Sequence, residues 1–332
     1  MPLEPTIVPF VAIRPGETAT PSARAGSADF GPLEHLFADP DVTDVFVNGA
    51  RDVWVDRGAG LERQASMGFL ESELRELAIH LVGLGGRHID ETNPCVDTRL
   101  HDGIRVHAVL PPISPQGTLL SIRIPRRQPL SVDDLELAGF FDAVSLAAVR
   151  ALVASRQNLL ITGAGGSGKT TLLSALLGEA ADTERIVAIE DVAELRVLHP
   201  HFIALEARQS NLEGAGGVGL ARLLREALRM RPDRLVLGEC RGAEVRELLG
   251  ALNTGHDGGA GTLHANSLAD VPARLEALGA LADLSATAMA RQAVSAIGSV
   301  LHVERSNGVR RLVQVGTFSL DERVRLIVRE SA

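Results

Sequence analysis

The sequence predicts an α/β protein in which a larger domain with a mostly parallel sheet follows a smaller α+β domain. From residue 157 onward, short apolar runs alternate with segments of helical spacing, an order that is typical of a parallel sheet covered by helices. Before residue 125, alternating strand patterns surround one helical segment and are joined by turns that contain glycine. The length of 332 residues fits about two domains, each with its own core.

The composition narrows the class of protein further. Hydrophobic residues make up 45% of the chain, Tyr is absent, and the formal net charge is −9. This acidic balance disfavours a broad nucleic-acid footprint. Cys95 and Cys240 are far apart, so they predict neither a disulfide framework nor a zinc site. Since the sequence has neither an apolar run of about 18 residues nor a leader pattern, we expect a cytoplasmic protein.

Changes in composition suggest four segments. Residues 1–29 are rich in Pro, Ala, Ser, Thr and Gly, and we expect a flexible tail there. The smaller α+β domain is expected over residues 30–125, with one helix over residues 71–84. We expect a linker over residues 126–145 and the larger domain over residues 146–332.

The larger domain is expected to begin near a helix over residues 131–155. Each strand expected after it is an apolar run bounded by polar or turn-forming residues, and each helix repeats apolar residues every three or four positions. The expected strands cover residues 158–162, 185–189, 234–237 and 260–264. The expected helices cover residues 169–177, 220–230, 243–252 and 270–278.

Residues 163–170 match the phosphate-binding pattern G-x-x-x-x-G-K-T/S, with a strand pattern before and a helix pattern after them. Glycines let the backbone fold around a phosphate with its N–H groups pointing inward, and the helix N-terminus adds partial positive charge. Lys169 would reach the outer phosphates, and the Thr170 hydroxyl would bind Mg²⁺. The predicted nucleotide-binding residues are Gly163, Ala164, Gly165, Gly166, Ser167, Gly168, Lys169, Thr170 and Thr171.

Lys169 is the only lysine in the chain, and all other basic side chains of the Lys/Arg type are arginine. A compact ammonium that reaches between phosphate oxygens is not interchangeable with a planar guanidinium. The position of the single lysine therefore supports a phosphate-binding role.

Two other apolar strands end in carboxylates, Glu190 in one and Glu239 in the other. Ligands bind at the carboxyl ends of the strands in doubly wound sheets, so both side chains could face the nucleotide. One would act as general base and the other would support the metal ion, and the sequence leaves open which is which. The alternative for Glu190 is that it caps a following helix.

A third candidate, His264, lies at the end of a short strand that follows a loop rich in polar residues and glycine. We expect it to contact a phosphate, with a purely structural role as the alternative. A metal site that combines His256 with His264 is disfavoured, because no third ligand follows in suitable spacing.

Taken in order, these motifs resemble the secretion ATPase superfamily of type II and type IV systems. The resemblance rests on the phosphate loop, residues 189–195, residues 230–239 and residues 253–267. In the first domain, residues 41–49, 102–106 and 121–125 resemble the tight-adherence (Flp) pilus ATPases and their actinobacterial relatives. No tetracysteine element is present, unlike one type II branch, and Cys240 stands where the family would have an aliphatic residue.

The resemblance implies a RecA-like P-loop ATPase domain with a smaller N-terminal α+β domain, assembled as a homohexamer that hydrolyses ATP with Mg²⁺. It implies that Glu190 is the catalytic acid–base residue, that Glu239 is the metal-side acid together with Thr170, and that His264 contacts the γ-phosphate. Arg105 and Arg123 would be the arginines with which the first domain closes on the phosphates.

The function implied is a motor that powers pilus assembly or protein secretion at the inner face of the cell membrane, acting on an inner-membrane platform protein. A conjugative DNA translocase or helicase-like motor is the first alternative, which the acidic balance disfavours. A nucleotide-gated scaffold without hydrolysis is the second, which the paired carboxylates disfavour.

Overall fold

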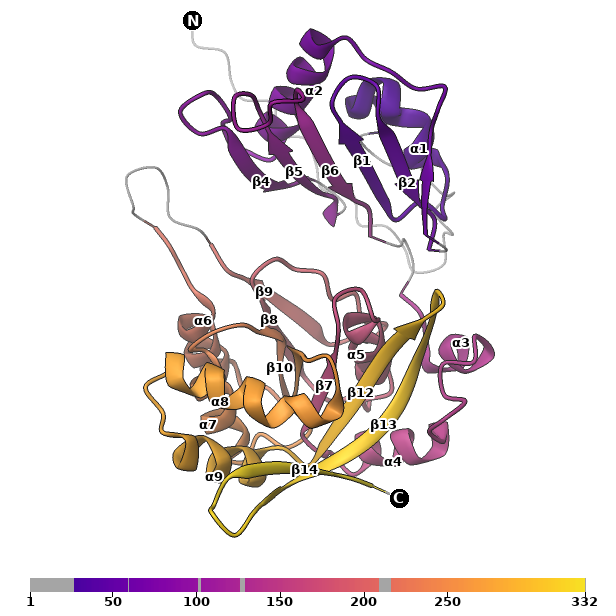
Figure 1. The fold of residues 1–332 in the computed structure, drawn as a ribbon. Coiled ribbons are helices and arrows are strands. Elements are labelled where there is room, and N and C mark those ends of the chain that lie inside the picture. Colours follow the sequence, from indigo (N-terminus) through magenta and orange to yellow (C-terminus); the bar gives the residue numbers. More distant parts are fainter. Residues whose placement is uncertain (1–26, 59, 101–102, 126–128, 209–215, 332) are drawn as a thin grey trace, which may run out of the picture. The chain divides into compact units, whose positions relative to one another are not determined.

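The computed structural model describes residues 27–58, 60–100, 103–125, 129–208 and 216–331, which form two compact units (Figure 1). The first unit contains the described residues up to Arg57 and Leu61–Ile124, and the second contains those of Gly58–Gly60 and from Pro125 onward. In this described part of the chain, no helix is both long and apolar enough to cross a membrane.

The first unit is an antiparallel sheet with helices packed against it. Its strand order is β3-β2-β1-β6-β5-β4. The strands are β1 (Asp44–Asn48), β2 (Val53–Asp56), β3 (Leu61–Arg63), β4 (Cys95–Arg99), β5 (Arg105–Val109) and β6 (Leu119–Arg123). The helices are a 3-10 helix (Ser27–Leu33), α1 (Glu34–Ala38) and α2 (Glu71–Leu84). Alternate strand residues such as Val45, Val106 and Ile122 are buried in one core with α2, so the opposite face of the sheet carries the polar side chains.

The second unit is built on a sheet in the order β14-β13-β12-β7-β11-β10-β8-β9. Its strands are β7 (Leu159–Gly163), β8 (Ile186–Glu190), β9 (Phe202–Glu206), β10 (Arg234–Cys240), β11 (Ala260–His264), β12 (Ser299–Ser306), β13 (Val309–Leu320) and β14 (Leu326–Glu330). The strands from β9 to β12 in this order are parallel, whereas β13 and β14 are antiparallel to their neighbours. This architecture confirms the predicted α/β fold with a smaller α+β domain before it.

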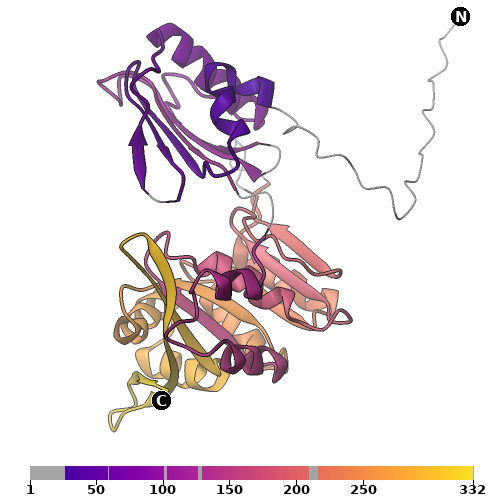
Figure 2. The same ribbon diagram turned by 90° about the vertical axis from the view of Figure 1, so that its right-hand side faces the viewer.

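Helices cover both faces of the second sheet (Figure 2). They are α3 (Val132–Leu137), α4 (Leu146–Ala154), α5 (Lys169–Gly178), α6 (Leu220–Ala227), α7 (Val245–Leu252), α8 (Val271–Leu281) and α9 (Ala286–Ala296). Successive strand residues point to opposite faces: Leu160 packs in the core that contains α6 to α9, and Ile161 packs in the core that contains α3 to α5. The central strands are buried on both faces, which explains their continuous apolar runs.

The expected single helix over residues 131–155 is wrong, because the structure has α3 and α4 with a turn between them. Gly139 has a φ of +73°, which a helix interior does not accept, and Phe140 and Phe141 are buried in the core beside α5. A continuous helix could not turn both phenylalanine rings into that core.

Two of the expected boundary segments are described only in part. Residues 1–26 of the expected tail lie outside the described residues, and residues 27–29 belong to the first 3-10 helix. Residues 126–128 of the expected linker, and Asp102 of the segment 102–106, also lie outside them. The remainder of the expected linker contains α3, whose Val132 and Leu135 are buried in the second unit's core.

Candidate functional site

The phosphate loop connects the carboxyl end of β7 to the N-terminus of α5 and has a shape that only glycines allow at several positions. Gly166 has a φ of +68° and Gly168, the N-cap of α5, has a φ of +104°. A Cβ on Gly163 would overlap the carbonyl oxygen of Val303 on β12. Of the next helical residues, Thr170 is half-buried and Thr171 is exposed, so both lie on the solvent-accessible side of the loop.

Lys169 lies under this loop and is 7% exposed. Its Nζ donates to the carbonyl oxygens of Gly163 at 3.0 Å and Ala164 at 2.9 Å, and it lies 3.4 Å from Nδ1 of His264. Burial lowers the pKa of Lys169 below its ordinary value, and the nearby Glu239 carboxylate partly opposes that shift. The ammonium is thus held at the strand end by weak acceptors that a more negative ligand could replace.

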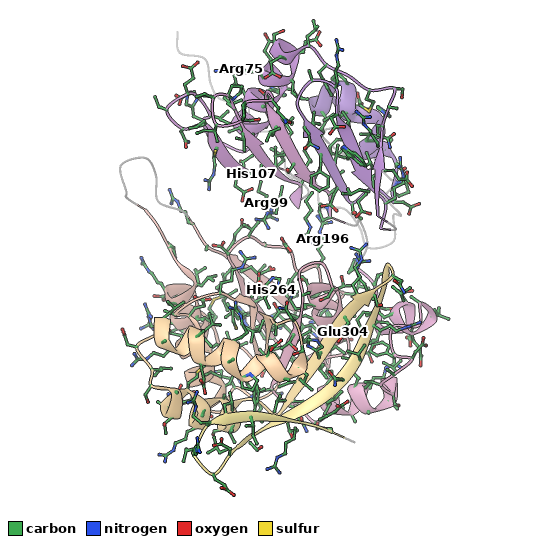
Figure 3. All side chains as sticks on the ribbon, viewed as in Figure 1. Arg75, Arg99, His107, Arg196, His264 and Glu304 are labelled. Atoms are coloured by element: carbon green, nitrogen blue, oxygen red, sulfur yellow. The ribbon has the colours of Figure 1, made fainter. Side chains whose placement is uncertain are left out.

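His264 links Lys169 to Glu239 on the neighbouring strand. His264 Nε2 lies 2.6 Å from Oε1 of Glu239. Since an ammonium can only donate, Nδ1 accepts from Lys169, so the ring proton of neutral His264 is on Nε2, the atom close to the carboxylate. Burial, followed by the Lys169 charge, lowers the pKa of His264, so the ring is neutral at pH 7. His264, the last residue of β11, is labelled in Figure 3.

Glu239 is held from its other side by Arg241, whose Nε donates to Oε2 at 2.6 Å. The register between β10 and β11 shifts between Leu237 and Cys240, so Glu239 lies in an irregular part of the strand. Such an irregularity changes the direction of a side chain. Sequence reasoning missed Arg241, although its place two residues after Glu239 was a usable signal.

Glu190, at the end of β8, is 4% exposed and is fixed by the backbone. Its Oε1 accepts from the N–H groups of Glu194 at 2.9 Å and Leu195 at 3.0 Å. Residues 192–199 form no helix in the described structure, so the helix-capping alternative is wrong and Glu190 instead organises a loop. Gly238 of β10 packs against its stem: a Cβ there would lie 2.6 Å from Cγ of Glu190. Glu190 and Glu239 therefore lie at the carboxyl ends of β8 and β10, which are neighbours in the sheet.

In the first unit, Arg105 and Arg123 face each other across β5 and β6, and Arg99 on β4 is paired with Arg105. Three arginines thus form a row across the open face of the sheet, where Figure 3 labels Arg99. Like charges directly opposite each other destabilise a sheet, and Asp44 of β1, which lies opposite Arg123, places a negative charge at one end of the row. Arg105 also lies 3.4 Å from Asp97. Sequence reasoning missed Arg99, because only strand register brings it beside Arg105.

Another arginine missed from the sequence, Arg310 of β13, contacts the phosphate loop directly. Its Nε donates to the carbonyl oxygen of Gly166 at 3.0 Å. No local sequence pattern connects residue 310 with residue 166, since the contact depends on the long-range pairing of β12 with β7.

Comparisons with known proteins find relatives that match most of this chain. A putative conjugal transfer protein of Mycobacterium tuberculosis is 48% identical over 295 residues, covering 87% of this chain and 84% of the relative. The conjugal transfer protein TrbB of Rhizobium radiobacter is 34% identical over 230 residues, or 68% of each chain. The type IV secretion system protein PtlH of Bordetella pertussis is 35% identical over 271 residues, covering 74% of this chain and 79% of the relative.

Solved structures share the fold at lower identity. The ATPase DotB of Yersinia pseudotuberculosis has a TM-score of 0.58 and 15% identity, covering 98% of this chain and 84% of its own. The pilus retraction motor PilT with bound ADP has a TM-score of 0.55 and 18% identity, covering 87% and 78%. The family model described as type II/IV secretion system protein matches residues 26–307. The chain therefore belongs to the type II/IV secretion system protein family.

Proposed function

We propose that this protein is an ATP-hydrolysing motor that powers pilus assembly or protein secretion at the cytoplasmic membrane. One observation carries the proposal: Lys169, His264 and Glu239 form a continuous chain of polar contacts beside a glycine-shaped phosphate loop. Each comes from the carboxyl end of a different parallel strand or from the helix after it, where ligands of such sheets bind. Membership of the secretion family supports the same conclusion.

The loop suits a nucleoside triphosphate with Mg²⁺. The start of α5 supplies N–H groups and partial positive charge, and Lys169 supplies a full positive charge. Thr170 and Glu239 would hold Mg²⁺ together with phosphate oxygens, which are the hard ligands this ion prefers. Mg²⁺, when bound, neutralises charge that develops on the transferred phosphoryl group.

Binding of phosphates would free Lys169 from the Gly163 and Ala164 carbonyls, because charged oxygens are the stronger acceptors. Neutral His264 could then donate to a phosphate oxygen, and Glu239 would keep Arg241 as its partner. We assign the general base to Glu190, whose carboxylate the backbone fixes at the strand end. Glu239 remains the alternative base.

We further propose that the first unit contributes to ATP hydrolysis through its row of three arginines, Arg99, Arg105 and Arg123. Arginines delivered by domain closure stabilise the charge of a phosphoryl-transfer transition state. We propose that the protein closes in this way as a homohexameric ring, which binds a platform protein at the inner membrane.

The branch of the family to which the chain belongs determines whether the motor moves pilus or secreted proteins, or DNA. The motifs of the first unit favour the tight-adherence pilus branch. The relative from Mycobacterium tuberculosis carries the name of a conjugal transfer protein, which favours a DNA-transfer motor as the second candidate. Turnover that rises severalfold on addition of single- or double-stranded DNA would support the second candidate, and unchanged turnover would support the first.

The central experiment separates binding from hydrolysis with Glu190→Gln. The amide fills the same space but loses basicity, so the variant should bind Mg-ATP and lose turnover. At 100 times the dissociation constant, Mg-ATP should still stabilise the fold by about 2.7 kcal/mol. Glu322→Gln, at an exposed position on the β13–β14 connection, is the control. If Glu190→Gln kept wild-type turnover, Glu190 would not be the general base, and that role would be assigned to Glu239.

The assembly is tested separately by light scattering with a slowly hydrolysed ATP analogue, where a hexamer is expected. Arg123→Ala should lower turnover more than it weakens binding. A monomer with full activity would contradict the composite site.

A further inference from the structure

The phosphate loop is flanked on two sides by different kinds of side chain. On one flank, His264 approaches the loop, since its Cε1 would lie 3.7 Å from a Cβ on Gly165. On the other flank, Arg310 covers the loop: its Cδ would lie 3.2 Å from a Cβ on Gly168, and its Nε holds the Gly166 carbonyl. In the sheet, β7 separates β11 from β12, so the two flanks lie on opposite sides of the strand before the loop.

The proposed function predicts how a bound nucleotide is oriented between these two flanks. His264, assigned to the γ-phosphate, and Glu239, assigned to the Mg²⁺ ion, lie on the β11 and β10 side of β7. A triphosphate that runs across the loop must therefore carry its nucleoside end toward the β12–β13 side. Arg310 occupies that side, with Phe140 beside it at 3.7 Å from the same Cβ position on Gly168.

The strand pairing at this flank also favours an anion. Arg310 lies directly opposite Arg305 in the β12–β13 ladder, where like charges are destabilising. The next pair is complementary, since Arg311 lies opposite Glu304, which Figure 3 labels on β12. Adjacent pairs in a ladder point to opposite faces, so the repulsive pair is confined to the face that carries Arg310.

The hairpin is also anchored where it meets the loop. The N–H of Leu312 donates to the Phe140 carbonyl oxygen at 2.9 Å, and Arg311 lies 3.3 Å from Asp142. Arg310 is thus held between two fixed points, the Gly166 carbonyl and the segment after α3, as a pre-organised side chain requires.

We propose that Arg310 binds the nucleoside end of the nucleotide, at the α-phosphate and sugar, and so lets the site distinguish a nucleoside triphosphate from an inorganic triphosphate. This inference rests on the proposed function. It adds a binding residue from β13, within the same unit as the phosphate loop.

The test compares ATP, ADP and inorganic tripolyphosphate as ligands of the full-length protein, by calorimetry with Mg²⁺. Arg310→Ala should lower the affinity for ATP and for ADP by about tenfold or more, which is the effect of losing a charge-assisted hydrogen bond. The affinity for tripolyphosphate should fall by less than about twofold, since its binding depends on the loop, α5 and Lys169. Arg323→Ala, at an exposed position on the β13–β14 connection, is the matched control and should leave all three affinities unchanged.

The outcomes separate this inference from the proposed function. Equal losses for ATP and tripolyphosphate would overturn it, because Arg310 would then only support the loop through Gly166. Unchanged ATP binding in Arg310→Ala would overturn it as well. Wild-type protein that binds neither ligand would instead reject the proposed function. Arg310→Lys should restore part of the ATP affinity, and the loss should appear in KM rather than in kcat.

Discussion

Replacing Gly238 by alanine should disturb Glu190 without changing its charge. The new Cβ would lie 2.6 Å from Cγ, 3.1 Å from Oε1 and 3.3 Å from Cδ of Glu190. Ordinary carbon contacts need roughly 3.5 Å or more, so the carboxylate must move by about 1 Å. A displacement of that size at a reacting group costs about a hundredfold in rate. Overpacking of the buried contact should cost about 1–3 kcal/mol of folding free energy.

The assay is steady-state ATP turnover together with a melting curve and the affinity for Mg-ATP. Turnover should fall much more than affinity. Gly250→Ala in α7 is the matched control, because a Cβ there meets nothing within 4 Å and alanine favours a helix. If Gly238→Ala folded with normal turnover, the position of Glu190 would not matter to hydrolysis, and the assignment of the base would be refuted.

Three further predictions concern other parts of the second unit. Lys169→Arg should lose about a hundredfold in turnover, because a guanidinium does not fit beneath the loop. A melting curve without nucleotide should show that the variant still folds, because glycines rather than this side chain shape the loop. Arg234→Met should cost about 1–3 kcal/mol in denaturant unfolding, since Arg234, 5% exposed, lies 2.6 Å from the carboxylate of Glu184, which keeps Arg156 as its second partner. Burial lowers the pKa of His302, so the unfolded chain takes up its proton first and stability should fall as the pH drops below about 6.5. Urea midpoints at several pH values should show this fall in the wild type and a smaller one in His302→Gln; an equal fall in both would contradict it.

The parts of the fold that the sequence predicted are those encoded by short segments. The strand, loop and helix around residues 159–178 follow from consecutive residues, and β8, β10 and β11 are apolar runs that are buried on both faces. Buried parallel strands have this pattern whatever their neighbours are. The strands β12, β13 and β14 were not predicted, because charged and polar residues interrupt their apolar runs and their stability comes from pairing with one another and with β7.

The candidate site divides in the same way. Glu190, Glu239 and His264 were found because each ends a recognisable strand, and the structure brings Glu239 and His264 into contact. Arg99 and Arg310 were not found, because strand register brings Arg99 beside Arg105, and Arg310 reaches Gly166 only through pairing of segments that are distant in sequence. Register is decided by turns and by burial of a whole face, and neither is visible at a single arginine.

The position of β12 beside β7 has a consequence for the order in which the protein can mature during synthesis. The motif itself is made early, but the strand that pairs with β7 on one side begins only at Ser299. Until then β7 has an open edge, which is a site for wrong pairing with another chain. The Val303 carbonyl under Gly163 and the Arg310 contact are missing at that stage too. A nascent chain can therefore complete its phosphate loop only after residues 299–320 have left the ribosome, far downstream of the motif.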